Sequence, residues 1–169
     1  MQPTLKTSIR LGAGSVVCAE ADLKGEVVIG PRTFIHPKAK IIAEGGPITI
    51  GEGNLIEEQV VIHNKPHPNG ERIPLSIGSY NVFEVGCTIE SQKIGDNNVF
   101  ECKSVCGRNT EVKNGCSIGA ACVVESKETL VDNTVIYGEN CLRKNAAERP
   151  PTQTLLLDFL CKVSFFDKF

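Results

Sequence analysis

The sequence predicts an all-β protein, a parallel β-helix of about seven triangular coils followed by a C-terminal α-helix. Three observations predict this fold. An apolar residue recurs at every sixth position, glycine often follows the repeated residue, and the repeat changes length only between groups of three repeats. An α-helix repeats about every 3.6 residues and a strand about every 2, so a period of six requires a short strand that bends at regular intervals.

The repeated apolar residues, called hexad residues below, form seven triplets. They are Leu11, Val17 and Leu23; Ile29, Ile35 and Ile41; Ile50, Ile56 and Ile62; Ile77, Phe83 and Ile89; Ile94, Phe100 and Cys106; Val112, Ile118 and Val124; and Leu130, Ile136 and Leu142. The step departs from six residues only after Ile41, Ile62 and Ile89, each the last residue of a triplet. A triangular prism with three strands per coil, and with loops tolerated at one corner, is the simplest object with this property. Hexad residues should fill its interior, and seven coils should stand about 34 Å tall at ~4.8 Å per coil.

The length of 169 residues allows one compact domain. We expect residues 1–147 to form the β-helix, with a corner loop near 64–76, and residues 148–169 to form a linker and a packing helix. Asp158 and Lys162 lie four residues apart in that helix and should form a pair, and Thr152 is available as its N-cap. One helical face should pack along the prism rather than bind a membrane or a partner helix, and it holds Leu155, Leu156, Phe159, Leu160 and Val163.

Composition excludes several function classes. The formal net charge is -2, with 18 Lys plus Arg against 20 Asp plus Glu, which argues against nucleic acid as a partner. No apolar run approaches the ~18 residues that span a bilayer, and the first ten residues lack the apolar core of a signal peptide, so we expect a soluble intracellular protein. The eight Cys show neither a C-x-x-C pair nor the spacing of a zinc site, which predicts reduced, mostly buried thiols.

The three histidines are the only candidates for acid–base or metal chemistry. His36 follows the second hexad residue of its coil, His63 follows the third of the next coil, and His67 lies inside the corner loop. The first two therefore fall on different faces of the prism, and the three are not expected to converge within one chain. Neither a phosphate-binding loop nor a nucleophile motif is present, so we expect no cofactor.

The segment Val61–His63 resembles the first ligand motif of the gamma-class carbonic anhydrases, which hold zinc with three histidines. The resemblance implies two further histidines in the next coil, but those positions hold Val85 and Glu90. One ligand of three does not make a catalytic zinc site, so no metal is expected. The alternative that stays open is a hexapeptide-repeat enzyme, either an acyltransferase or a carbonic anhydrase-like protein, that uses His63 or His67.

An octet with Asn at its fifth and Glu at its eighth position occurs in three consecutive coils, at 50–57, 77–84 and 94–101. Stacked coils should place Asn54, Asn81 and Asn98 in one column, which we interpret as structural because Asn suits corners and bonds to its neighbours. A second column should hold Glu57, Glu84 and Glu101. Stacked like charges are unfavourable, so this column is either fully solvated or an acidic stripe that binds a partner. These three residues are the candidate partner-binding site.

Several stretches resemble the dynactin subunit 6 family, in the group of hexapeptide-repeat left-handed β-helix proteins. The resemblance runs from about Ser8 to Lys162 and is carried by Gly30–Thr33, Gly51–Gln59, Gly95–Asn98, Asn133–Gly138 and the tail from Glu148 to Leu160. It implies left-handed coils and a non-enzymatic scaffold subunit of dynactin, located in the cytoplasm and associated with the cytoskeleton. It also implies a heterodimer with dynactin subunit 5, contacts with other pointed-end subunits, and a role in dynein-driven cargo transport on microtubules.

Overall fold

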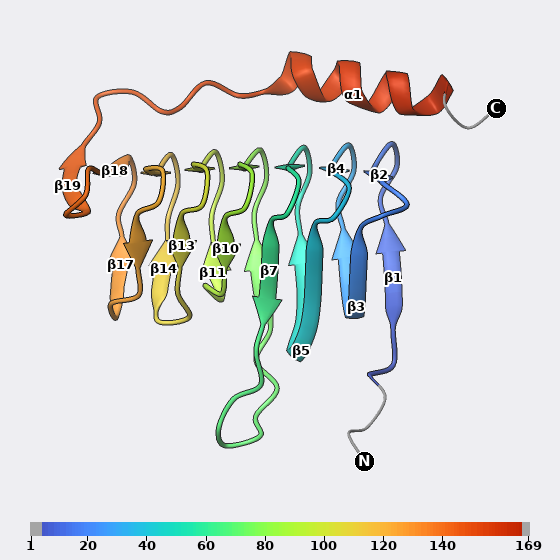
Figure 1. Ribbon diagram of the computed structural model, residues 1–169, viewed down its shortest axis with the longest axis horizontal. Helices are drawn as coiled ribbons and strands as arrows, with labels where there is room; N and C mark the ends of the chain where they lie inside the picture. The colour runs from blue at the N-terminus through green and yellow to red at the C-terminus, as the bar shows by residue number, and fades with distance from the viewer. Residues whose placement is uncertain (1–4, 167–169) are drawn as a thin grey trace.

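The computed structural model describes residues 5–166, with side chains through Val163. The coils stand side by side along the long axis of the molecule, and a single helix lies across them (Figure 1). The left-handed parallel β-helix of about seven coils is confirmed. Its strands are short because the chain turns a corner about every six residues.

The second face of the prism is a separate sheet of eight strands in the order β19-β18-β15-β12-β9-β6-β4-β2. Seven of them pair in parallel, one from each coil. Their bounds are β2 (Val16–Val17), β4 (Phe34–Ile35), β6 (Leu55–Ile56), β9 (Val82–Phe83), β12 (Val99–Phe100), β15 (Ser117–Ile118) and β18 (Thr134–Tyr137), with β19 (Leu142–Asn145) at the end.

The first and third faces are joined into one eleven-stranded sheet, because two long strands run through both faces. These long strands are β3 (Asp22–Ile29) and β5 (Lys40–Ile50). The other first-face strands are β1 (Ser8–Leu11), β8 (Leu75–Ile77), β11 (Lys93–Ile94), β14 (Thr110–Val112) and β17 (Glu128–Leu130). The other third-face strands are β7 (Val61–Asn64), β10 (Thr88–Ile89), β13 (Val105–Cys106) and β16 (Val123–Val124).

The hexad residues stack in register from coil to coil, as the sequence predicts. Leu11 pairs with Ile29, which pairs with Ile50, and the first-face column continues without a break to Leu130. Most of these side chains are fully buried, and the rings of Phe83 and Phe100 stack with centroids 4.9 Å apart. All three changes in repeat length fall between the third and first faces, so the prediction of one variable corner is confirmed.

The close approach of the next coil requires glycine at position 51, directly after the first-face hexad residue Ile50. A Cβ atom added to Gly51 would lie 2.6 Å from the carbonyl oxygen of Gly78. Such a contact cannot be relieved without moving the backbone, so glycine at this corner follows from coil stacking.

The seventh triplet was predicted wrongly at its last member. Leu142 does not continue the prism; it is 53% exposed and lies in β19, which pairs antiparallel with β18. The chain reverses between the two strands through Gly138 and Cys141, which have φ angles of 75° and 48°. A left-handed turn of this kind breaks the coil path while leaving the sixfold spacing of the sequence intact.

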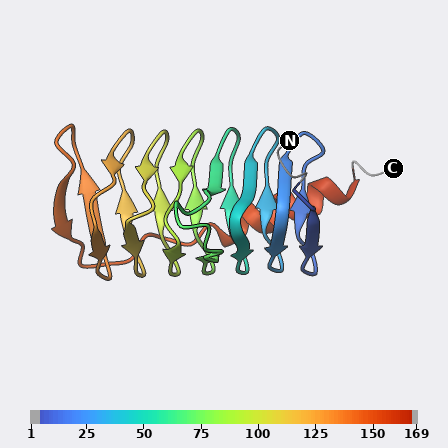
Figure 2. The same ribbon diagram turned by 90° about the horizontal axis from the view of Figure 1, so that it is seen from below.

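Helix α1 (Thr154–Phe166) lies on the outside of the second face and runs back toward the N-terminal coils (Figures 1 and 2). The predicted position along the prism is correct, but of the five residues predicted to be buried only Leu160 packs against the second face. Leu157 is the buried contact, at 4% exposure, and packs with Phe34, Leu55 and Val82. The helix begins at Thr154, so Thr152 lies one residue too early to be its N-cap.

Candidate partner-binding surface

The asparagine column is a continuous hydrogen-bonded ladder inside the corner of the prism. Asn54, Asn81 and Asn98 are at most 1% exposed. The side-chain oxygen of Asn54 accepts the backbone N–H of Asn81 at 2.9 Å, and that of Asn81 accepts the N–H of Asn98 at 2.9 Å. Each amide nitrogen donates to a backbone carbonyl, as Asn54 does to Gly78 at 2.9 Å. Buried amides satisfied in this way stabilise the corner, which supports the structural interpretation.

The glutamate column forms a second ladder on the outside. Oε2 of Glu57 accepts the backbone N–H of Val85 at 3.1 Å, and Oε2 of Glu84 accepts that of Cys102 at 3.0 Å. Glu101 repeats the contact with Ala120 at 2.9 Å. Each carboxylate therefore binds the backbone of the following coil, which offsets the repulsion between stacked charges. The three side chains are half-buried, and burial raises the pKa of Glu57 above its ordinary value.

His36 stands one coil before Glu57 and connects the ladder to its neighbours. Its Nδ1 lies 3.2 Å from Oε1 of Glu58, and its ring meets the Phe34 ring edge-on at a centroid distance of 4.8 Å. This histidine is held by a carboxylate on one side and by an aromatic ring under helix α1 on the other.

Helix α1 presents a second apolar face to the outside. Leu155 is 87% exposed and Phe159 is 62% exposed, and Leu156 and Val163 are each 41% exposed. All four belong to the helical face that was expected, from the sequence, to pack against the prism. Asp158 forms an ion pair with Arg32 at the edge of the second face instead of the predicted pair with Lys162. Because apolar residues occur on both sides of the helix, the sequence pattern alone did not select the inner side.

The histidines do not converge on a common site. Nε2 of His63 lies 2.7 Å from Oε2 of Glu44, and Nε2 of His67 lies 3.0 Å from the amide nitrogen of Gln92. Glu90, one of the two positions expected to hold a ligand in a carbonic anhydrase, forms an ion pair with Lys65. Val85 is the residue whose backbone N–H binds Glu57. Within residues 5–166, no group of three or more His, Cys, Asp or Glu side chains is arranged to hold a metal.

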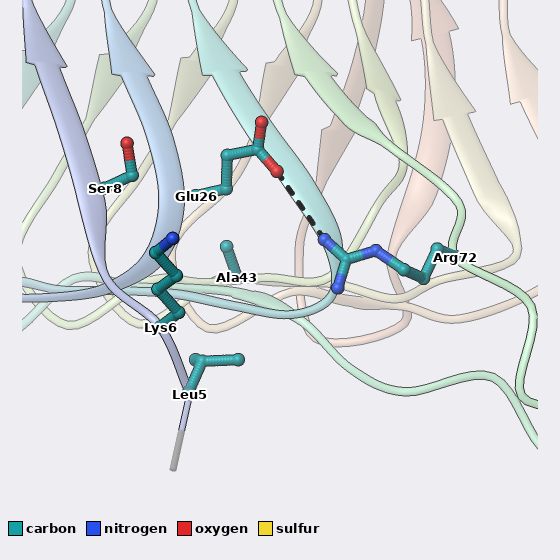
Figure 3. Close-up of a pocket in the computed structure, with 6 residues that line it drawn as sticks. All are labelled: Leu5, Lys6, Ser8, Glu26, Ala43 and Arg72. Atoms are coloured by element: carbon teal, nitrogen blue, oxygen red, sulfur yellow. Dashed lines mark ion pairs between the residues drawn. The ribbon is translucent and has the colours of Figure 1, made fainter. Parts of the chain in front are cut away.

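A cavity of about 380 Å³ lies between the start of β1 and the corner loop, and Figure 3 shows the six residues that line it. Its charged members are Lys6, Glu26 and Arg72, all exposed, and the Arg72 guanidinium lies 3.6 Å from Glu26. Ser8 is the single hydroxyl in the lining, and no histidine accompanies it. The cavity therefore supplies no nucleophile and base pair.

A third ladder was missed in the sequence. The side chains of Ser79, Asp96, Asn114 and Asp132 each accept a backbone N–H from the preceding coil, at 2.7–3.0 Å. A signal was present, because each of these polar residues stands two positions after a first-face hexad residue. Polar side chains at the corners therefore join successive coils in three separate ladders.

The chain is similar to proteins of several animals over nearly its whole length. Dynactin subunit 6 of Nematostella vectensis is 56% identical over 161 residues, which cover 92% of this chain and 88% of that protein. Dynactin subunit 6 of Xenopus tropicalis is 52% identical, with 92% and 81% covered. The Caenorhabditis elegans protein of the same name is 32% identical, with 95% and 87% covered. No protein-family model matches the chain.

Solved structures show the same fold at low sequence identity. A hexapeptide transferase family protein from Anaplasma phagocytophilum has a TM-score of 0.62 and 16% identity, and covers 94% of this chain and 87% of its own. A putative acetyltransferase from Bacillus cereus has a TM-score of 0.59 and 17% identity, with 92% and 86% covered. In the described part of the chain, no helix has the length and apolar character needed to cross a bilayer.

Proposed function

The chain belongs to the dynactin subunit 6 family, and from this membership we propose that it is a non-catalytic scaffold subunit of the dynactin complex. In this role it lies at the pointed end of the actin-like filament, in the cytoplasm, and supports dynein-driven transport of cargo on microtubules. The observation that carries the proposal is the 56% identity to a dynactin subunit 6 over 92% of this chain.

The direct partner in this proposal is dynactin subunit 5, in a heterodimer that contacts other pointed-end subunits. The surface offered to partners is the outside of the second face, on which helix α1 packs and whose strands β6, β9 and β12 are followed directly by Glu57, Glu84 and Glu101. The backbone bond occupies one oxygen of each carboxylate and leaves the negative charge at the surface. The exposure of Leu155 and Phe159 supports a protein partner, since a helix that is apolar on both sides is normally buried on both sides.

The alternative is a hexapeptide-repeat enzyme that uses His63 or His67. The fold neighbours include transferases, and the contact between His63 and Glu44 is an imidazole–carboxylate pair of the kind that general bases use. His67 faces the amide of Gln92 rather than a carboxylate. The scaffold role has the stronger support, because the close relatives carry the dynactin name while the transferases are below 20% identical.

Co-purification tests the proposal directly. A tagged chain expressed in animal cells should recover the dynactin subunits in fixed stoichiometry, and co-expression with dynactin subunit 5 should give a heterodimer on size-exclusion chromatography. The purified chain should turn over neither acyl-coenzyme A nor carbon dioxide, and elemental analysis should find less than stoichiometric zinc. Recovery without dynactin subunits, together with turnover that the His63→Ala variant abolishes, would favour the enzyme.

A further inference from the structure

The two ends of the β-helix are finished differently. At the C-terminal end, β19 pairs antiparallel with β18 over four residue pairs, from Thr134 with Asn145 to Tyr137 with Leu142. At the N-terminal end, within residues 5–166, β1 pairs only with β3, and β2 pairs only with β4. Figure 1 shows this first coil standing at the end of the row.

The first coil leaves backbone groups of its hexad residues without a protein partner in the described range. In each later coil, the carbonyl of the first-face hexad residue accepts an N–H from the coil before, as Ile29 does from Gly12 at 2.7 Å and Ile50 from Gly30 at 2.7 Å. The second face repeats the pattern, since Ile35 accepts from Cys18 at 3.0 Å. Leu11 and Val17 hold the same positions in the first coil, and within residues 5–166 no other coil lies on that side of it. Since alternate residues of a strand bond to opposite neighbours, their N–H and C=O groups point outward from the end.

The same end exposes part of the apolar interior. Leu11 is 54% exposed, and Val17 and Leu23 are half-buried against the core. Their counterparts one coil later, Ile29 and Ile35, are exposed by 1% and 0%. The first coil thus combines open strand edges with uncovered core side chains, a combination that folded proteins normally cover.

Arg10 does not block this edge. It alternates with Ile9 and Leu11 along β1, so that its side chain points to the outside of the prism rather than across its end. The positive charge of Arg10 therefore does not lie at the edge of β1 where an added strand would pair, and it does not oppose strand addition.

We propose that this end of the β-helix, formed by β1, β2 and the start of β3, binds an extended segment of a partner protein. The segment adds a strand to the edge of β1 or β2 and places apolar side chains over Leu11, Val17 and Leu23. Open backbone groups in an extended strand are satisfied best by another extended backbone, and the chain itself uses that solution at its other end with β19. Head-to-tail stacking of two copies is blocked on the second face because β19 already covers β18.

The inference rests on the proposed function only for the source of the segment, which is another dynactin subunit.

Photocrosslinking tests whether such a segment binds at this end, with a benzoylphenylalanine residue placed at Leu11 or, as a matched control, at Leu142. The two positions are exposed by 54% and 53%, and they lie at the open and the covered end. The tagged chain is crosslinked in cells, purified, and analysed by mass spectrometry of the linked peptides.

We expect position 11 to link to one peptide of a different subunit, and position 142 to give at least tenfold less of that product. In the assembled complex, the backbone amides of Leu11 and Val17 should also exchange at least tenfold more slowly than in the isolated chain. Links from position 11 to a second copy, links to residues 1–4 of the same chain, or no link would each overturn the inference. Normal recovery of dynactin subunits in those cases would leave the proposed function standing, whereas failure to recover them would count against the function itself.

Discussion

The carboxylate of Glu84 accepts the backbone N–H of Cys102, one coil further along the prism, at 3.0 Å. The same carboxylate oxygen lies 3.4 Å from Sγ of Cys102, and the hydrogen bond between them raises the pKa of that thiol. Because Glu57 and Glu101 make the same backbone contact in their own coils, the acidic column contributes to the stability of the fold whether or not it binds a partner. The effect of the negative charge can be separated from the effect of the hydrogen bonds, because Gln removes the charge and keeps a hydrogen-bond acceptor whereas Lys removes both.

Replacing Glu57, Glu84 and Glu101 together by Gln should leave the fold nearly unchanged, since the Gln carbonyl can accept the same N–H. Replacing all three by Lys removes the acceptors and should cost about 0.5–1.5 kcal/mol per contact in the free energy of unfolding. Thermal melts followed by circular dichroism measure both effects. Equal melting temperatures for the Gln and Lys variants would mean that the backbone contacts contribute no stability.

The Gln variant also tests partner binding without disturbing the ladder. If the column is an acidic stripe that binds dynactin subunit 5, loss of three charges should weaken heterodimer recovery at least several-fold, and high salt should weaken recovery of the unsubstituted chain in the same direction. Undiminished recovery of the Gln variant would remove the column as an interface.

The interior positions should tolerate charge least. Ile118 and Ile136 are exposed by 1% and 0%, so replacing either with Asp buries an unpaired carboxylate and should cost several kcal/mol, comparable to the whole stability of a domain. Val123, on an outward position of β16 and 50% exposed, provides the control. Soluble expression should be lost for Ile118→Asp and kept for Val123→Asp. The opposite order would mean that the inward and outward positions are exchanged.

The hexad residues could be assigned to the interior from the sequence because a period of six residues determines where each short strand lies and where the chain turns a corner. The same spacing failed at Leu142, since the reversal at Gly138 depends on a left-handed turn that periodicity does not encode. The inner face of α1 was not predictable because apolar residues occupy both faces, and the packing of Leu157 against Phe34 and Leu55 is a contact between residues far apart in the sequence. The glutamate contacts depend on side-chain conformations across coils, which no sequence pattern of one coil contains.

The corner loop should tolerate deletion at its tip but not at its base. At the base, the Asn64 amide donates to the Ile73 carbonyl at 2.7 Å, and Lys65 pairs with Glu90. At the tip, residues 68–71 are exposed, and their side-chain contacts are local. Removing residues 68–71 should lower the melting temperature by a few degrees at most. Asn64→Ala should cost more, about 1–3 kcal/mol, because two buried carbonyls lose their donor. If thermal melts showed that removing residues 68–71 destabilises the protein more than Asn64→Ala does, the distinction between a tolerant tip and a structural base would be refuted.

The docking of helix α1 on the second face should depend mainly on Leu157 among its several leucines. Leu157 is 4% exposed against Phe34 and Leu55, so Leu157→Ala should weaken docking of the helix by about 2–5 kcal/mol. Leu155→Ala, at a position 87% exposed, is the matched control and should change the isolated chain little. Hydrogen exchange of residues 154–163 reports docking directly. Faster exchange in the Leu155 variant than in the Leu157 variant would reverse the assignment of the inner face.

The covered end should loosen in acid. Glu128 accepts two hydrogen bonds from the Arg143 guanidinium, one of them at 3.1 Å from Nε, and this contact holds β19 against the last coil. The hydrogen bond from Arg143 is the main cause that lowers the pKa of Glu128 below its ordinary value. For a carboxyl group whose pKa is lower in the folded protein, the stabilisation is complete above the ordinary pKa of about 4.3 and is lost as the pH falls through the lowered value. Glu128→Gln should therefore reduce protection of the β19 amides at pH 7, and its effect should shrink as the pH falls through the lowered pKa of Glu128. A series of hydrogen-exchange measurements from pH 7 into acid tests this, and an effect of the substitution that does not change along the series would show that the ion pair does not hold this end closed.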